Sequence, residues 1–335
     1  MVKNKKFPHE RQNYSIPYGA ENWFNVTRNK RRAERTVDAM KSIRRNRGWA
    51  APYLLILPGL LFILIFLAYP LARVFYLSLQ HYNPSKPYIT GFAGLANFKT
   101  MFGKPEFYQA LSNSGRWVVS EVVLQLVIGM MIALALNVSF RGRGICRVII
   151  FVPWALSGVL TATLWSLIYN EHMGALNAFL LQTGLIQKGA AWLGNRHYVF
   201  NAVVIAELWR GIPFFAISLL AAMQNISPDL YEAADIDGCS AARRFFFITL
   251  PLLKEQIVLT TLLRTVWEFN SVDLIYSLTG GGPAGMTTTL SMYIADQAIR
   301  TSNYGYGSAV SVVSFFILTI FAVIYIRSTR FGQEV

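Results

Sequence analysis

Long runs of apolar residues separated by short polar segments occupy most of the chain from about residue 50 onward. A transmembrane helix needs about 20 apolar residues to cross the hydrocarbon core of a bilayer. The runs are continuous rather than alternating, which excludes the strands of an outer-membrane barrel. They predict an all-α integral membrane protein with six transmembrane helices, at Pro52–Leu79, Val118–Val138, Val148–Tyr169, Val199–Met223, Leu250–Ser271 and Ala309–Ile326.

The distribution of lysine and arginine orients the predicted bundle. With the N-terminus inside, 20 of these residues fall in the tail, the inner loops and the C-terminal end, and seven fall in the outer loops. Because basic loops stay on the cytoplasmic side, both termini are expected in the cytoplasm. The formal net charge of +14 therefore reflects topology and does not indicate binding to nucleic acid.

The first 48 residues form a basic, polar tail without the apolar run that a signal peptide requires. Two interpretations remain open: a tail that rests on anionic lipid, or an amphipathic helix over about Arg31–Arg45 that lies along the membrane surface. We therefore expect a cytoplasmic tail at 1–48 and a transmembrane domain at 49–335.

The loop between the fourth and fifth predicted spans, residues 227–251, has the composition of a docking element. It opens with Ser227, a residue typical of helix caps. The small side chains of Ala233 and Ala234 would let another surface approach closely. With a second helix over Ala241–Phe247, the segment forms a helix-turn-helix on the cytoplasmic face, a shape suited to a groove in a partner.

This loop resembles the EAA loop of the maltose-type carbohydrate permeases, which belong to the binding-protein-dependent ABC importers. The resemblance rests on Glu232-Ala233-Ala234, Asp237-Gly238 and Leu250-Pro251, and it extends over about residues 50–330. It implies that 49–335 is a permease domain, and that the EAA loop couples it to an ATPase through Glu232, Ala233, Ala234, Asp237 and Gly238.

The resemblance also implies the partners, which are a second homologous permease, an ATPase dimer and an extracytoplasmic substrate-binding protein, assembled in the lipid of a bacterial inner membrane. The chain lacks a phosphate-binding loop, because Gly280–Gly282 is not followed by Lys-Ser/Thr. We therefore expect no enzyme activity, no catalytic residues and no cofactor or metal here, with ATP and magnesium used by the ATPase. A self-sufficient secondary transporter and a membrane anchor for a cytoplasmic partner remain as alternatives, but the first does not explain the EAA loop and the second does not explain the arginines inside the spans.

Ionisable residues inside membrane spans are costly and are candidates for function. Glu207 with Arg210, and Arg264 with Glu268, have the spacing of intrahelical ion pairs, so mutual neutralisation stays open. The resemblance places the sugar contacts of the family on the fourth and fifth spans. The matching substrate-binding positions are Arg210, Gly211, Phe214, Arg264, Glu268 and Ser271.

Two arginines depart from the small polar and aromatic residues of the maltose-type pattern. Because the planar guanidinium suits carboxylate, sulfonate and phosphate, the sequence favours an acidic, uronate-type oligosaccharide. A neutral oligosaccharide and a sulfonated or phosphorylated small sugar remain alternatives. Elsewhere, Glu121 and Gln125 are expected to pack against the partner permease, and Trp117 to anchor a helix at the membrane interface.

Overall fold

The computed structural model describes residues 51–329, and the chain divides after Leu71 into two compact units. The first unit contains α2 (Ala51–Ile63), the π-helical η1 (Leu64–Ala68) and the start of α3 (Tyr69–Ser78). Every residue from Pro52 to Leu71 is uncharged, and within the first unit these side chains are exposed, a composition suited to the hydrocarbon core of a membrane. The predicted tail, including the possible helix Arg31–Arg45, lies outside the described residues.

The second unit opens with a short antiparallel pair of strands, in which Gln80 lies opposite Phe92. The side chain of Asn97 stabilises the start of this strand pair, because its Nδ2 donates to the carbonyl oxygens of Ser78 and Gln80, each at 2.9 Å. Strands of two residues have no detectable periodicity, and the sequence did not predict them. The elements are β1 (Gln80–His81), the 3₁₀-helix η2 (Pro87–Ile89), β2 (Gly91–Phe92) and α4 (Ala96–Phe102).

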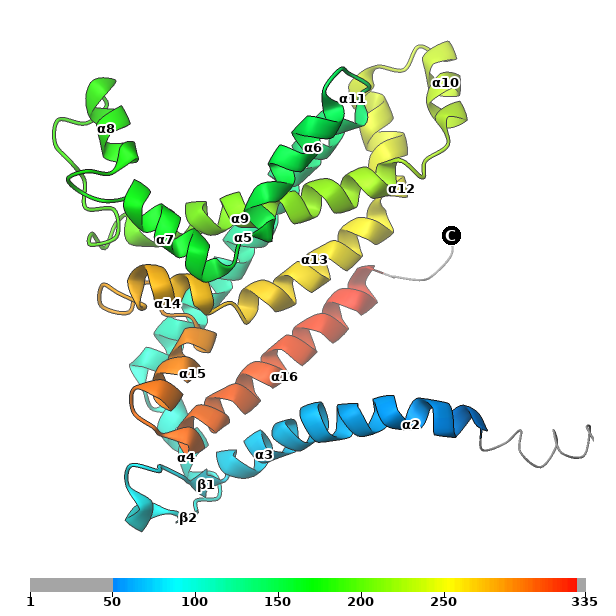
Figure 1. Cartoon of the computed structure of the whole chain (residues 1–335). Coiled ribbons are helices and arrows are strands. Elements are labelled where there is room, and N and C mark those ends of the chain that lie inside the picture. Colours follow the sequence, from blue (N-terminus) through cyan, green and yellow to red (C-terminus); the bar gives the residue numbers. More distant parts are fainter. Residues whose placement is uncertain (1–50, 330–335) are drawn as a thin grey trace, which may run out of the picture. The chain divides into compact units, whose positions relative to one another are not determined.

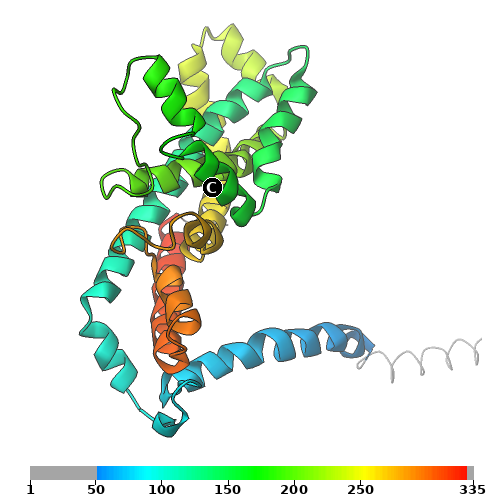
Figure 2. The same cartoon turned by 60° about the vertical axis from the view of Figure 1, so that its left-hand side comes forward.

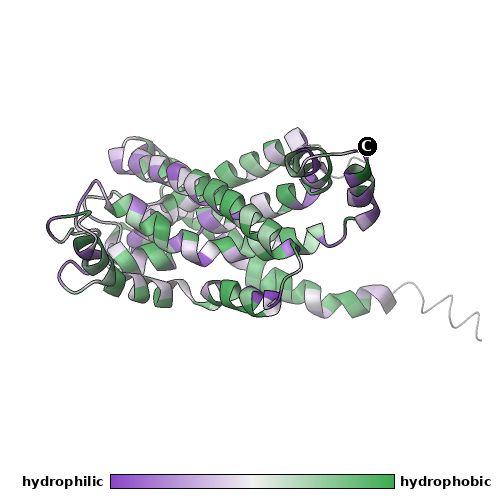
Figure 3. Ribbon diagram, turned by 90° about the horizontal axis from the view of Figure 1, so that it is seen from above, coloured by the Kyte–Doolittle hydropathy of each residue, from purple (hydrophilic) through white to green (hydrophobic). Residues whose placement is uncertain are grey.

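Four helices are long and apolar enough to cross a membrane among the residues described, and two bent pairs raise the number to six if each pair is one span. Figure 3 shows hydrophobic residues along much of the helical ribbon. The predicted all-α membrane fold is confirmed. The long helices are Pro52–Ser78, α5 (Pro105–Asn137), α9 (Val199–Met223) and α16 (Tyr304–Thr329).

The third predicted span is not one straight helix. Its two halves meet at an angle of 98°. Pro153 stands in the first turn of the connecting 3₁₀-helix, and Ser157 caps a new helix by accepting the N–H of Leu160 at 3.3 Å. The prediction of a single helix over Val148–Tyr169 was therefore wrong. The elements are α6 (Arg143–Phe151), η3 (Val152–Ala155) and α7 (Gly158–Ile168).

The fifth predicted span begins earlier than expected and bends by 66° at Leu253. Pro251 lies just before this bend and offers no N–H to the helix. The predicted helices Ala241–Phe247 and Leu250–Ser271 are thus joined through a π-helical turn into one path from the EAA loop to the bundle. Its elements are α11 (Ala241–Arg244), η4 (Phe245–Thr249), α12 (Leu250–Leu252) and α13 (Lys254–Phe269).

Shorter helices lie at the two ends of the long ones within the second unit. Figures 1 and 2 show α10 to α12 at one end of α9 and α13, and α14 and α15 at the other. The former group contains the EAA loop. The remaining elements are α8 (Ala175–Gln182), α10 (Pro228–Ile236), α14 (Asp273–Thr279) and α15 (Leu290–Ile299).

The core of the second unit is built on the contact between α5 and α9. A Cβ atom on Gly129 would lie 2.6 Å from Cβ of Phe215 and 3.1 Å from the backbone nitrogen of Ala216. Small residues permit such close approach of helices in membranes. Buried apolar side chains surround this point and include Met130, Ala133, Leu136, Leu219, Leu220 and Met223. This contact holds α5 and α9 together beside α13.

Candidate functional site

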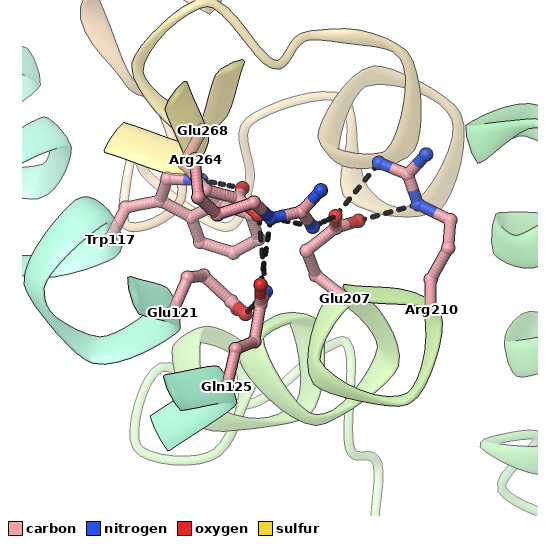
Figure 4. Close-up of polar contacts among 7 residues, drawn as sticks. All are labelled: Trp117, Glu121, Gln125, Glu207, Arg210, Arg264 and Glu268. Carbon is pink, nitrogen blue, oxygen red and sulfur yellow. Dashed lines mark hydrogen bonds and ion pairs between the residues drawn. The ribbon is translucent and has the colours of Figure 1, made fainter. Parts of the chain in front are cut away.

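Polar and charged side chains from three helices meet in the interior of the bundle (Figure 4). Glu121 and Gln125 come from α5, Glu207 from α9, and Arg264 and Glu268 from α13. All five are buried. Because a charge withdrawn from water is costly unless it is paired, the arrangement depends on how these groups satisfy one another.

Glu207 lies between two guanidinium groups. It accepts hydrogen bonds from Nε and Nη2 of Arg210, at 2.9 and 2.8 Å, in bidentate geometry. Its Oε1 also accepts Nη2 of Arg264 at 2.8 Å. One carboxylate therefore neutralises an arginine on its own helix and links α9 to α13.

Arg264 connects the same network to α5. Its Nη2 pairs with Oε1 of Glu268 at 2.6 Å, and its Nε donates to Oε1 of Gln125 at 2.7 Å. The Gln125 amide donates to Glu268 at 3.1 Å and to Glu121 at 2.8 Å. Trp117 Nε1 donates to the second oxygen of Glu268 at 3.1 Å. The network thus joins α5, α9 and α13 into one polar core.

Two expectations drawn from the sequence are corrected by this network. Gln125 and Glu121 are both 0% exposed and bond within the chain, so they do not form a surface for the partner permease. Trp117 is 2% exposed and is not an interface anchor. The spacing of Glu121 and Gln125 placed them on one helix face, but it did not show that this face turns toward α13.

Gly211 is necessary for the network to close. A Cβ atom at this position would overlap the guanidinium of Arg264 and the side-chain amide of Gln125. Its lack of a side chain makes room for both groups. The predicted substrate contact Gly211 is a buried residue of α9 next to Arg264 and Gln125.

A cavity of about 300 Å³ lies beside the network. Four of the predicted substrate residues line it, namely Arg210, Arg264, Glu268 and Ser271. Phe214 is absent from the lining, and its ring packs on Trp267 with 5.1 Å between centroids. Glu207, Val266, Trp267, Asn270 and Asp273 complete the wall.

Two polar groups in the cavity wall are available to a ligand. Ser271 Oγ is buried and has no hydrogen-bond partner within residues 51–329. Arg210 uses Nε and Nη2 for Glu207, and its remaining nitrogen points away from that carboxylate (Figure 4). The side chain of Arg210 is 20% exposed, compared with 5% for Arg264. Arg210 is thus the more accessible cation.

The carboxylates in the cavity wall offset the arginines. Both predicted intrahelical ion pairs form, and Asp273 adds a third carboxylate to those of Glu207 and Glu268. The cavity wall therefore contains three acidic side chains and two basic ones. The sequence did not single out Asp273, because it follows the apolar run of the fifth span and has the appearance of a loop residue.

The EAA loop folds as a helix followed by a glycine turn. Ser227 Oγ accepts the N–H of Asp229 at 3.4 Å and caps α10. Gly238 has φ of +70°, a conformation that glycine adopts without strain. The N–H of Cys239 then donates to the carbonyl of Ala234 at 2.9 Å and closes the turn. The predicted cap and turn are confirmed.

Two contacts fasten α10 to the segment that leads into α13. The Tyr231 hydroxyl lies 2.9 Å from Oγ1 of Thr249, and Asp235 forms an ion pair with Arg244. Arg244 lies on α11 and Thr249 on η4. The two contacts therefore hold α10 against the start of the fifth span.

Most of the predicted coupling residues are on the open side of this loop. Glu232, Ala233, Asp237 and Gly238 are exposed. Ala234 is 7% exposed, so it packs inside the chain and does not offer an open face as the sequence suggested. Large apolar side chains stand beside them, with Ile236 88% and Phe247 76% exposed.

Comparison with known proteins agrees with these features. Residues 125–331 match the family model described as binding-protein-dependent transport system inner membrane component. The chain belongs to this family. It is therefore an integral membrane permease and not an enzyme, and the resemblance drawn from the EAA loop is confirmed.

Related proteins align with most of this chain. The trehalose/maltose transport system permease protein MalF of Thermococcus litoralis is 38% identical over 285 residues, which are 84% of this chain and 94% of that protein. The sulfoquinovosyl glycerol transport system permease protein SmoG of Agrobacterium fabrum is 33% identical over 83% of this chain and 89% of its own.

A solved structure has the same fold. A chain of a bacterial ABC transporter involved in the import of the acidic polysaccharide alginate superposes with a TM-score of 0.75. The match covers 89% of this chain and 100% of that chain at 23% sequence identity. At this identity the likeness establishes the fold alone.

Proposed function

We propose that the chain is a sugar-transporting permease subunit of an ATP-driven importer, and that it passes sugar along the cavity between α9 and α13. The main structural support for this proposal is the chain of helices that connects the EAA loop to this cavity. α11, η4 and α12 follow one another directly, and only Leu253, where the path bends by 66°, separates α12 from α13. A movement of the EAA loop would therefore reach Arg264, Glu268 and Ser271 directly.

An ATPase dimer is the partner that fits the open face of α10. A short helix laid into a groove is a common docking mode, and Ile236 with Ala233 offers an apolar, close-packing surface. The Asp235–Arg244 and Tyr231–Thr249 contacts make α10 move together with the base of α13. ATPase closure would then be transmitted as a rigid-body movement that alternates access to the site.

A second, homologous permease would complete the sugar path. The cavity of about 300 Å³ is at the lower limit of ligand pockets, which span about 300–1,000 Å³. A second wall from the partner would enlarge it to the size of an oligosaccharide. The extracytoplasmic binding protein would deliver sugar at the end of the bundle opposite the EAA loop, with both termini of this chain in the cytoplasm.

A neutral oligosaccharide is the cargo that the charge balance of the cavity supports. Arg264 and Arg210 are engaged by Glu207 and Glu268, and Asp273 adds a negative charge. Trp267, Asn270 and Ser271 supply an aromatic face and neutral polar groups, the mixture typical of ligand pockets. The relative named for trehalose and maltose supports the same class.

An acidic, uronate-type oligosaccharide is the second candidate, together with a sulfonated or phosphorylated small sugar. The free terminal nitrogen of Arg210 and its 20% exposure favour it. The relative named for sulfoquinovosyl glycerol transport supports an anionic sugar in this family.

Substrate-stimulated ATPase activity of the reconstituted importer distinguishes these candidates. We expect stimulation by neutral oligosaccharides, retained in Arg210→Gln and in the control Arg196→Gln, an exposed outer-loop residue. Stimulation by acidic sugars alone, lost in Arg210→Gln but not in the control, would replace the neutral cargo by the acidic one. Stimulation by no sugar would reject the proposed function.

A further inference from the structure

An apolar groove lies between α6 and α9, near the EAA loop and separate from the sugar cavity. Its volume is about 350 Å³. Figure 1 shows the start of α6 at the same end of the second unit as α10 and α11. Apolar side chains line most of the groove, namely Val148, Phe151, Ile217, Leu220 and Ala221, with Arg147 and Gln224 as its polar members.

Arg147 lines the polar end of this groove, and Arg143 lies one helical turn before it on α6. With its amide oxygen toward them, Gln224 accepts Nη2 of Arg147 at 2.7 Å and Nη2 of Arg143 at 3.1 Å. The Nε atoms of both arginines are buried without a hydrogen-bond partner. Neither has a carboxylate within ion-pair distance among residues 51–329. Two positively charged guanidinium groups therefore share one neutral acceptor. A bound anion would reduce the repulsion between them.

We propose that an anionic phospholipid binds here, with its phosphate on Arg143 and Arg147 and one acyl chain along the groove. Guanidinium groups bind phosphate in bidentate geometry, and basic pockets between helices on the cytoplasmic side bind lipid head groups. The apolar part of the groove includes Phe151 at 40% and Val148 at 67% exposure, so it is open to an acyl chain.

Charge and shape favour lipid over the other possible occupants. The N-terminal tail contains 13 lysines and arginines before Trp49, so it would be repelled by the arginine pair. A free phosphate would satisfy the arginines but leave the apolar groove uncovered. A phospholipid satisfies both parts. Because Gln224 immediately follows α9 and precedes α10 by only a short turn, the bound lipid would brace the entry to the EAA loop.

Lipid retention by the purified complex tests this proposal. The importer, with all its subunits, is given equal amounts of phosphatidylglycerol and phosphatidylcholine, and native mass spectrometry measures the lipid that remains bound. We expect a preference of about tenfold for phosphatidylglycerol, equivalent to about 1.4 kcal/mol. The double variant Arg143→Gln/Arg147→Gln loses the preference, whereas Arg141→Gln, an exposed neighbour, keeps it.

A second variant separates the site from a general effect on folding. Ala221→Trp fills the apolar groove but leaves both arginines in place, and it should also lose the bound lipid. Equal retention of the two lipids by the unmodified complex would overturn the proposal. So would unchanged retention in the double variant, or displacement of the lipid by millimolar inorganic phosphate.

Discussion

At the scale of single residues, Glu207 determines whether the polar core can exist inside a membrane. It is 0% exposed and pairs with arginines from two helices. Removing one partner of a buried pair leaves an uncompensated charge, which costs more than the pair itself contributes. The network is therefore sensitive to which member is removed.

Neutralising Glu207 should harm the protein more than neutralising Arg210. Glu207→Gln removes the ion-pair partner of Arg210 and one of the two carboxylates paired with Arg264, and we expect a loss of about 3–5 kcal/mol of stability. Arg210→Gln should cost less, because Arg210 is partly exposed and Glu207 still pairs with Arg264. Unfolding temperatures of the two variants in the same detergent compare them. A lower temperature for Arg210→Gln would contradict this account.

Two glycines in the helices offer a matched test of packing. A Cβ atom on Gly211 would overlap Arg264 and Gln125, whereas one on Gly115 in α5 meets nothing within 4 Å. Alanine at Gly115 should stabilise its helix by up to about 1 kcal/mol. Alanine at Gly211 should destabilise the protein by about 1–3 kcal/mol, because the core is overpacked. Thermal unfolding measures the stability of both variants. Equal stabilisation by the two substitutions would contradict this account, because it would show that the polar network has space for a methyl group at Gly211.

At the scale of elements, the apolar runs predicted where helices form but not where they bend. The predicted span Val199–Met223 has the bounds of α9, because its run ends at polar residues on both sides. The 98° and 66° bends were missed. A bend leaves the apolar composition unchanged, and its causes, Pro153 with the Ser157 cap and Pro251, are tolerated inside many membrane helices.

The open face of α10 should be required for assembly with the ATPase. Ile236→Asp places a charge on a side chain that is 88% exposed, so the fold should be unaffected while docking is lost. The ATPase retained by the affinity-purified permease pair measures this. Ile299→Asp, at a 64% exposed position of α15 on the opposite end, should retain the ATPase. Equal retention by both variants would place the ATPase contact elsewhere.

At the scale of the whole molecule, the sequence predicted which helices line the cavity but not how they face one another. Arg210, Arg264, Glu268 and Ser271 line it as expected. Gly211 and Phe214 do not, and Gln125 entered the network unexpectedly. Spacing along one helix identifies residues on a common face, whereas the rotation of that face toward other helices depends on packing across the bundle.

The predicted function also depends on the assembly, because a permease of this family has no ATPase of its own. The chain has the EAA loop and the cavity, while energy and sugar delivery would come from other subunits. Uptake of labelled sugar into proteoliposomes therefore tests the central claim most directly. We predict accumulation of neutral oligosaccharide only when this chain is combined with its partner permease, the ATPase with ATP, and the binding protein. Sugar uptake by this chain alone, driven by an ion gradient, would contradict the account and identify a secondary transporter.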